Sequence, residues 1–358
     1  MAFTQRLPPL PTIQEIIRIY GLRAKKNLSQ NFLLDLNLTR KMVKSAGNLN
    51  GAFVIEVGPG PGGITRSLIN TNASKIVAVE KDRRFMPSLQ VLSAASKGRL
   101  DVILGDIMDT DLISLIPPEL HAEWHSSPPK VHIIGNLPFS IATPLIIQWL
   151  RNISEKSAAW RLGRVPLTLT FQKEVAERIV APPKSEHRCR LSVMCQYLCD
   201  VKLQFIIPGK AFVPPPEVDV GIVTCIPKVE PLIQQPFKLV EKVNRHLFHL
   251  PNKYFTKTLS TLFPLVREDL CYNILETTGL DPKLRAFEMT MEDIRKVCDA
   301  YAGIIEKEPQ LFEYDFRSKV DSKERRYEGN LILALEEKLM QKREDNSEDS
   351  GVESSKIG

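Results

Sequence analysis

A four-residue run near the middle of the chain has the residue types that could hold an exocyclic amine on a flat ring. Asn136, Leu137, Pro138 and Phe139 directly follow the apolar stretch 131–135. The Asn136 side-chain oxygen and the Leu137 carbonyl can accept both N–H groups of an amine, which favours a tetrahedral nitrogen. Pro138 fixes φ and has no competing N–H, and the Phe139 ring can stack on an extruded base. The run therefore predicts a clamp that holds an exocyclic amine. The alternative is an Asn-initiated turn with Phe139 packed in the core.

A glycine-rich loop earlier in the chain predicts a nucleoside-cofactor site. Gly58, Gly60 and Gly63 form G-x-G-x-x-G between an apolar run and a helix-like stretch. This spacing allows close backbone approach to a ligand at a helix N-terminus. Glu80 closes the next apolar run, where a carboxylate can accept hydrogen bonds from ribose hydroxyls. A nicotinamide oxidoreductase has the same pair of features, so the loop and the acid leave the kind of nucleoside open.

Three further features favour S-adenosylmethionine over a nicotinamide cofactor. Glu56 precedes the first glycine by two residues, near the expected place of a positively charged methionine moiety. Asp106 ends the third apolar run, where it can accept from an adenine amino group, with Ile107 beside the ring. The run that begins at Asn136 reaches the same carboxyl edge of the predicted sheet, where α/β folds bind ligands. The sequence also places no catalytic His or Tyr near that edge, which argues against the oxidoreductase.

These motifs stand at the ends of apolar runs that alternate with helix-length segments. Four of the runs, at 52–58, 75–81, 100–106 and 131–136, are continuous rather than alternating, which is typical of parallel strands buried on both faces. Further strand-like stretches follow at 166–171, 201–208 and 219–227. The pattern predicts an α/β fold with crossover helices.

The character of the sequence changes after about residue 228. Segment 229–319 has apolar residues at spacings of three and four and no strand signals, which predicts a small all-helical C-terminal domain after the α/β domain at 27–228. Segment 320–358 is charged and polar and is expected to be disordered. Segment 1–26 carries five basic residues and one acid around an apolar stretch. The sequence leaves two interpretations of this segment open: a basic N-terminal arm or a mitochondrial targeting segment.

Charge and apolar content limit the possible partners. No stretch approaches the roughly 18 consecutive apolar residues of a membrane span, so no membrane association is predicted. Ten of the 48 basic and fourteen of the 42 acidic residues lie from Glu306 onward, which leaves a net charge of +10 before it. A basic body favours a polyanionic partner, although many soluble enzymes are basic too.

Cysteine and histidine patterns give no sign of a metal site. The six cysteines include no C-x-x-C pair and are expected to be reduced thiols of an intracellular protein. His121 and His125 are four residues apart, but they stand among Pro, Ser and Glu in an expected loop. No metal is predicted.

Together these residues resemble one family, the rRNA adenine N6-dimethyltransferases, over about residues 27–305. The runs that carry the resemblance are LSQNFLLD, EVGPGPGGITRSL, AVEKD, GDI, GNLPFS, FQKEVAERI, RLSVMCQYL and AFVPPPEVDV. Several look most like the mitochondrial branch. The resemblance implies a Rossmann-like class I methyltransferase sheet and S-adenosylmethionine as cofactor. It also implies dimethylation of two adjacent adenines in a hairpin near the 3′ end of mitochondrial small-subunit rRNA, needed for small-subunit assembly in the mitochondrial matrix.

The resemblance further implies roles for individual residues. Phe212 would stack on the target base opposite Phe139, although by residue type it is better explained as a core residue. The implied catalytic residues are Asn136, Leu137, Pro138, Phe139 and Phe212. The implied cofactor-binding residues are Gln30, Asn31, Leu33, Gly58, Gly60, Glu80, Lys81, Asp106, Ile107 and Asn136.

The chain departs from the family where a helix of the small domain often opens with Arg-Arg-Lys. Here the stretch HLFHLPNKYFTKTL keeps only Lys253 and Lys257, and Pro251 interrupts it. Because each lost cation weakens attraction to phosphates, Lys242, Arg245 and the N-terminal arm are expected to compensate. The alternative is that these basic residues only solvate the face of the helix and do not contact phosphates.

Two hypotheses about partners remain open. The first is an enzyme, expected to be a monomer, that acts on small-subunit rRNA or a ribosome assembly intermediate. The second is a nucleic-acid-binding mitochondrial transcription factor that meets the transcription machinery and for which methylation is dispensable. The intact acids and the Asn-Leu-Pro-Phe run favour the enzyme.

Overall fold

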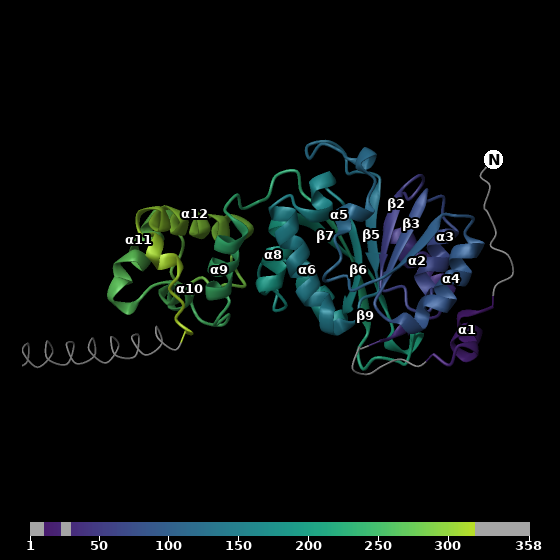
Figure 1. Ribbon diagram of the computed structural model, residues 1–358. Coiled ribbons are helices and arrows are strands. Elements are labelled where there is room, and N and C mark those ends of the chain that lie inside the picture. The colour runs from purple at the N-terminus through teal and green to yellow at the C-terminus, as the bar shows by residue number, and fades with distance from the viewer. Residues whose placement is uncertain (1–10, 23–29, 319–358) are drawn as a thin grey trace, which may run out of the picture. The chain divides into compact units, whose positions relative to one another are not determined.

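The chain folds into two compact units, Met1–Lys238 and Leu239–Gly358, in a computed structural model that describes residues 11–22 and 30–318 (Figure 1). The expected disorder of 320–358 lies outside the described residues. Sequence patterns place the domain change at residue 229. The backbone N–H groups of Lys228 and Leu232, however, donate to carbonyls of helix α8 (Arg190–Leu198) in the first unit, each at 2.8 Å.

A seven-stranded sheet, mostly parallel, forms the centre of the first unit. Its strand order is β4-β3-β2-β5-β6-β9-β7, with β9 antiparallel to both of its neighbours. The strands are β2 (Phe53–Val57), β3 (Lys75–Glu80), β4 (Leu100–Leu104), β5 (Val131–Gly135), β6 (Leu167–Gln172), β7 (Cys199–Ile207) and β9 (Val220–Pro227). Every residue of β2 and β5 is buried, as the continuous apolar runs predict. The predicted α/β class is confirmed.

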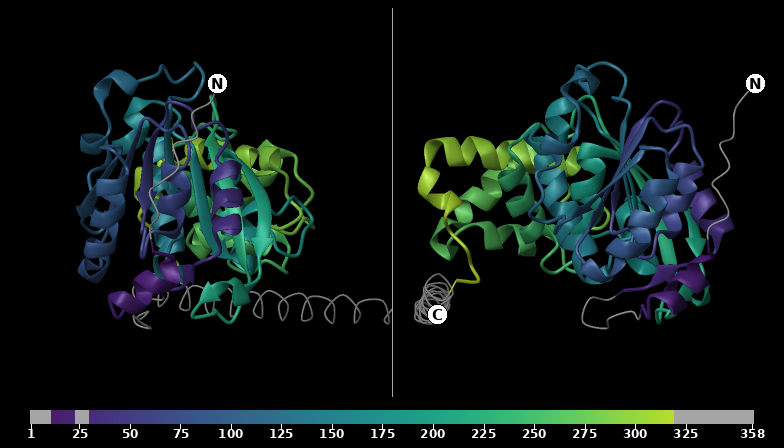
Figure 2. Two further views of the ribbon diagram at one scale, coloured as in Figure 1. Left: turned by 90° about the vertical axis from the view of Figure 1, so that its right-hand side faces the viewer. Right: turned by 45° about the vertical axis from the view of Figure 1, so that its right-hand side comes forward.

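Helices cover both faces of this sheet. Helices α2 to α4 lie on one face, and α6 and α8 lie on the other (Figure 1). Helix α1 lies at the end of the α2 to α4 layer (Figure 2). The helices are α1 (Ile13–Ile19), α2 (Leu36–Ser45), α3 (Gly63–Ile69), α4 (Met86–Ala95), α5 (Leu112–Leu115), α6 (Phe139–Ser154), α7 (Lys173–Val180) and α8 (Arg190–Leu198).

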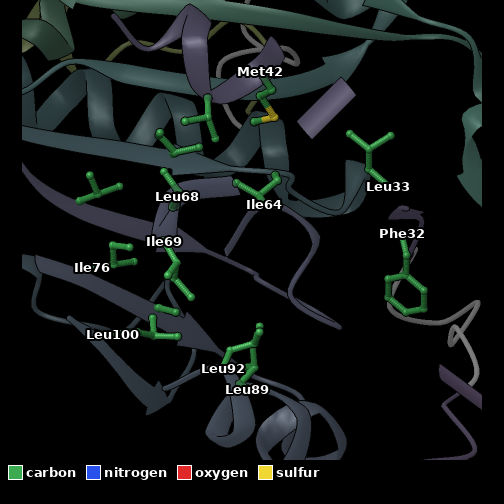
Figure 3. Packing of buried hydrophobic residues seen from close by; sticks show 14 of the residues in the cluster. Phe32, Leu33, Met42, Ile64, Leu68, Ile69, Ile76, Leu89, Leu92 and Leu100 are labelled. Atoms are coloured by element: carbon green, nitrogen blue, oxygen red, sulfur yellow. The ribbon is translucent and has the colours of Figure 1, made fainter. Parts of the chain in front are cut away.

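A hydrophobic cluster joins the α2 to α4 layer to the sheet. Met42 of α2 and Leu68 of α3 pack with Ile76 and Leu100 of the sheet, all at most 1% exposed (Figure 3). Burial of each such side chain contributes roughly 1.5–3 kcal/mol. The cluster therefore fixes the helix that follows the glycine loop against the strands that flank it.

The strand order brings the two motifs together. From β2 the chain builds β3 and β4 on one side and then returns to β5 on the other, which makes the gap between β2 and β5 a topological switch point. Val57 and Gly135 are partners at the carboxyl ends of these strands. The loop after β2 and the Asn-Leu-Pro-Phe run after β5 therefore lie side by side.

A small second sheet was not predicted from the sequence. Strand β1 (Phe32–Leu33) pairs antiparallel with β8 (Phe212–Val213), with Leu33 opposite Phe212. Two-residue strands have no detectable periodicity, and these two are about 180 residues apart. This pair ties the segment before α2 to the loop before β9.

The second unit is helical throughout its described part, which confirms the predicted small all-helical domain. Thr290 and Asp293 form a capping box at the start of α12, and Gly279 ends α11 with φ +63°. The helices are α9 (Phe237–Leu247), α10 (Phe255–Leu259), α11 (Glu268–Thr278) and α12 (Met291–Lys307), followed by the 3-10 helix η8 (Pro309–Phe312). Over the described residues of the whole chain, no helix combines the length and the apolar character that a membrane crossing requires.

Two cations of α9 serve the packing of this unit. The Lys242 side chain is 6% exposed, and its ammonium donates to the carbonyls of Leu311, Phe312 and Tyr314 at 3.3, 2.5 and 2.8 Å. Arg245 pairs with Asp315 at 3.6 Å. The expectation that Lys242 compensates for missing phosphate contacts is wrong, because its charge is enclosed by η8 and the residues after it.

Candidate active site

Two neighbouring cavities open at the carboxyl edge of the sheet, beside the switch point. Their empty volumes are about 690 and 790 Å³. The residues that line both are Gln30, Gly58, Glu80, Leu137 and Pro138. Together the cavities are also lined by all the other residues that the sequence predicts for the site: Asn31, Leu33, Gly60, Lys81, Asp106, Ile107, Asn136, Phe139 and Phe212.

The glycine loop adopts a backbone that side chains would hinder. Gly58 and Gly60 have φ of +64° and +55°, in the left-handed region that favours glycine. Gly63 needs its small size for another reason, since a Cβ there would lie 2.5 Å from the Leu33 carbonyl oxygen. The loop can thus approach both a ligand and the β1 segment closely.

Glu80 is a buried carboxylate aimed at this loop. It is 5% exposed, and its oxygens accept the backbone N–H groups of Gly60 at 2.9 Å and Asp82 at 2.7 Å. Burial raises the pKa of Glu80, and the two N–H donors oppose that shift. A carboxylate oxygen has more than one lone pair, so the group can still accept from a ligand hydroxyl.

Asp82 and Arg84 hold the predicted residue Gln30 at the rim of both cavities, and sequence analysis missed them. The Gln30 amide donates to Asp82 at 3.1 Å, and Arg84 donates to the Gln30 amide oxygen at 3.3 Å. The hydrogen bond from Arg84 lowers the pKa of Asp82 to about 2. The signal was present as an acid and a base within four residues after Glu80 in AVEKDRRF.

Asp106 has a protein partner that the sequence did not reveal. Its carboxylate accepts from the Lys81 ammonium at 2.5 Å and from the Met108 backbone N–H at 3.0 Å. The Lys81 hydrogen bond lowers the pKa of Asp106. Ile107 is 7% exposed beside it. An adenine amino group that binds here would share Asp106 with Lys81.

Thr170 of β6 fixes the Asn136 amide, and sequence analysis missed it too. Its hydroxyl donates to the Asn136 side-chain oxygen and accepts the Leu137 backbone N–H, both at 3.1 Å. The Asn136 amide nitrogen donates to the Asn31 carbonyl at 3.1 Å. Thr170 is fully buried, in a strand run that reads only as core. These bonds determine which way the Asn136 amide faces.

The two aromatic residues predicted to sandwich a base have different surroundings. Phe139 opens α6 and is half-buried at the cavity. Phe212 is 1% exposed and belongs to the hydrophobic cluster, although its ring also lines the cavity. The structure thus gives Phe212 the core position that its residue type suggests.

The sequence places Glu56 near a positively charged ligand, but the structure buries this acid beneath the glycine loop, outside both cavities. Glu56 is 0% exposed, and burial raises its pKa to about 8, while the nearby Thr65 opposes the shift. No hydrogen bond of normal geometry reaches either carboxylate oxygen within the described part of the chain. Glu80 and Asp106 line the cavities as acceptors for hydroxyl and amino groups, which fits the adenosyl part of a cofactor. Glu56 itself lines neither cavity.

The described residues contain no group of three or more His, Cys, Asp or Glu side chains placed to hold a metal ion. All six cysteines are free thiols, and five of them are buried. The acids at the sheet edge instead bond to backbone N–H groups and to cations of the chain.

Comparisons with known proteins identify one family. A family model described as ribosomal RNA adenine dimethylase matches residues 21–302. The "Dimethyladenosine transferase 1, mitochondrial" of Homo sapiens is 52% identical over 88% of this chain and 92% of its own length. The protein of the same name from Caenorhabditis elegans is 43% identical over 90% of each chain.

Solved structures show the same fold. A dimethyladenosine transferase from Plasmodium falciparum superposes with a TM-score of 0.60 at 22% identity, over 77% of this chain and 97% of the other. The 23S rRNA methyltransferase ErmE gives a TM-score of 0.53 at 21% identity, over 75% and 99%. The fold is therefore that of the Rossmann-like class I methyltransferases. From the family match and the identity to its relatives, the chain belongs to the ribosomal RNA adenine dimethylase family, whose members methylate rRNA adenines with S-adenosylmethionine.

Proposed function

We propose that this enzyme dimethylates N6 of two adjacent adenines in a hairpin near the 3′ end of mitochondrial small-subunit rRNA. It would act as a monomer in the mitochondrial matrix during assembly of the small subunit. The names of the relatives, mitochondrial dimethyladenosine transferases about 50% identical over about 90% of the chain, support the compartment and the dimethyl product. The observation that carries the chemistry is the Asn136 amide, fixed by Thr170 and Asn31 at the cavity.

The chain's own residues act on the amine by orientation. When bound, S-adenosylmethionine supplies a methyl group on a positively charged sulfur. The Asn136 side-chain oxygen and the Leu137 carbonyl accept the two N–H groups of the adenine amine and turn its lone pair outward. The Thr170 hydroxyl donates to the Asn136 side-chain oxygen and accepts the Leu137 backbone N–H, so it fixes the position of both residues. No strong base is needed, because alignment supplies most of the rate and the product can lose its proton afterwards.

Base stacking falls mainly to Phe139. Its half-buried ring at the start of α6 lines the same cavity as Asn136. Stacking of Phe212 on the base requires the β8 loop to open, because the ring is 1% exposed and its strand is paired with β1. In the closed loop, Phe212 supports the cavity wall.

The helical unit would contact RNA phosphates through the cations that remain exposed. Lys253 and Lys257 flank Tyr254, which is 48% exposed at the start of α10. Arg285 is the backbone bridge partner of Tyr254 and is exposed as well. Cations beside an exposed aromatic ring suit a single-stranded nucleotide and its phosphates. Lys242 is excluded from this role by its burial.

Methyl transfer to a synthetic rRNA hairpin tests the proposal. Purified wild type should place two methyl groups on each of two adjacent adenines. Asn136→Ala should lower kcat by about 100-fold or more, and the exposed control Asn48→Ala should leave it unchanged. Cofactor affinity, measured by calorimetry, should fall far less than kcat.

The possible outcomes separate the hypotheses. Methylation that persists at the wild-type rate in Asn136→Ala contradicts the clamp. A wild type that binds the hairpin without methylating it would instead support the nucleic-acid-binding transcription factor.

A further inference from the structure

Part of the segment that reads as a targeting sequence is a capped helix. Residues 13–19 form α1, and Thr12 and Glu15 close a capping box at its start. The Glu15 carboxylate accepts the Thr12 backbone N–H at 2.6 Å, and the Thr12 hydroxyl accepts the Glu15 N–H at 3.2 Å. A capping box satisfies two helix-terminal donors, so the sequence itself specifies where this helix begins.

One face of α1 is part of the hydrophobic core of the first unit. Ile13 and Ile16 are 4% and 2% exposed, and Leu22 just after the helix is 5% exposed. Ile16 and Leu22 belong to the same cluster as Met42. Ile19, one turn after Ile16 at the end of the helix, is 64% exposed. The amphipathic pattern that resembles an import signal is therefore also the pattern of a helix packed in place.

The partner of α1 is the helix that follows the glycine loop. Arg66 of α3 is 7% exposed, and its guanidinium donates to the Pro11 carbonyl at 2.5 Å. Gly63 opens α3 and lines the cofactor cavity. A Cβ placed on Gly63 would lie 3.5 Å from Ile13 Cδ1. Thus α1 touches the wall of the cavity from behind.

We propose that residues 11–22 remain in the working enzyme and that α1 positions the glycine loop for the cofactor. Proteolytic removal of a targeting segment, if it occurs, must then end before Pro11. Removal of residues 1–26 would expose Ile16, Leu22 and the cluster beneath them and would leave Arg66 without its acceptor. The part that concerns processing rests on the proposed mitochondrial location, whereas the part that concerns the cavity does not.

Truncated proteins test the role in the cavity. The full chain and two shortened chains, lacking residues 1–10 or 1–26, are purified from bacteria and titrated with S-adenosylhomocysteine by calorimetry. The chain that lacks 1–10 should bind within about twofold of the full chain. The chain that lacks 1–26 should bind at least tenfold more weakly or fail to fold, as judged by circular dichroism. Full affinity and an unchanged melting temperature after loss of 1–26 would overturn the proposal.

A point variant keeps the test independent of gross unfolding. Ile13→Ala removes the side chain that packs beside Gly63 and should weaken S-adenosylhomocysteine binding severalfold while the circular dichroism spectrum is retained. Ile19→Ala, at an exposed position near the end of the same helix, is the matched control and should bind like wild type. Equal affinities for the two variants would show that α1 does not position the loop.

The first residue of the mature protein tests whether proteolytic removal ends before Pro11. The protein is isolated from mitochondria through a C-terminal tag, and its first residue is identified by mass spectrometry. A chain that starts at or before Pro11 agrees with the proposal, and one that starts between residues 12 and 27 overturns it. Absence of the protein from mitochondria would contradict the proposed location, while the binding experiments would still decide the role of α1.

Discussion

The sheet edge of the first unit and the α9 face of the second unit both carry charged residues that the sequence predicts to bind ligands. These residues line cavities at the sheet edge, whereas one of them on α9 is buried. At the sheet edge, Glu80 and Asp106 line the cavities even though each has partners in the chain. On α9, the Lys242 ammonium is enclosed by backbone carbonyls. Residue type and position in the sequence thus predict correctly which charged residues line a cavity at the sheet edge, and predict wrongly that Lys242 is available to a ligand.

The difference has a topological cause. The carboxyl ends of parallel strands meet at one edge whatever the side chains are, so residues at those ends converge. The exposure of a residue on a helix depends on what packs over it. On α9 the covering segment is 311–315, which comes from about 70 residues further along the chain. Packing can therefore bury a cation that the sequence pattern predicts to face a ligand. Strand order, in contrast, still brings the acids at the strand ends to the edge of the cavities.

The largest expected effect concerns Glu56, beneath the sheet edge, because burial raises the pKa of this acid. The pKa of Glu56 is raised from about 4.5 to about 8, so the folded protein binds more protons than the unfolded chain between these pH values. Stability should therefore fall as pH rises through this window, by at most about 5 kcal/mol. Glu56→Gln should remove this dependence. Urea unfolding of both proteins at pH 5, 7 and 9 measures it, and parallel pH profiles would contradict it.

The second expected effect tests the packing role of α9. Lys242→Met removes a charge from the carbonyls of residues 311, 312 and 314 and should lower the free energy of unfolding of the helical unit by about 2–4 kcal/mol. RNA affinity of the folded protein should stay the same. The control Lys257→Met, at an exposed position, should leave stability unchanged and weaken RNA binding. The reverse pattern would mean that Lys242 faces RNA.

The third effect sharpens the account of the sheet edge. Thr170→Val keeps the shape of the side chain but removes the hydroxyl that bonds to Asn136 and Leu137, and should lower kcat by roughly 30-fold with KM for the cofactor nearly unchanged. Thr170→Ser should restore most of the activity. Thr168→Val is the matched control, because its hydroxyl bonds to His132 at 3.0 Å in the same buried strand. An equal loss of kcat in both Val variants would show a general packing effect.

The smallest effect concerns the exposed cations of the helical unit. Lys253→Ala should weaken hairpin binding by about twofold to fivefold and lower the slope of log affinity against log salt by about 0.7–0.9. Binding titrations across a salt series measure both quantities. Lys307→Ala, at an exposed position of α12, should change neither. An unchanged slope for Lys253→Ala would place the RNA elsewhere.

Most of the fold could be predicted from local pattern. The apolar runs became the strands of the sheet, and the helical stretches after residue 235 became α9 to α12. Strands β2 and β5 are fully buried, but the expectation of burial on both faces is wrong for the edge strand β4, where Asp101 and Leu104 are exposed. The boundary between the units is less distinct in the sequence. Residues 228–232 carry no strand or helix pattern, yet they belong to the first unit and hydrogen-bond to its helix α8. The two-residue strands β1 and β8 are too short to leave a pattern at all.

By itself the sequence determined where the chemistry-bearing residues stand: the glycine loop, the acids at the strand ends and the Asn-Leu-Pro-Phe run. Each is encoded within a few neighbouring residues, and strand order then brings them to one edge. Only the tertiary structure decided how those residues are held and which charges remain available. Thr170 reaches Asn136 across 34 residues, Asn31 reaches it across 105, and Pro11 reaches Arg66 across 55. Such contacts arise from the packing of distant segments, which no local spacing records.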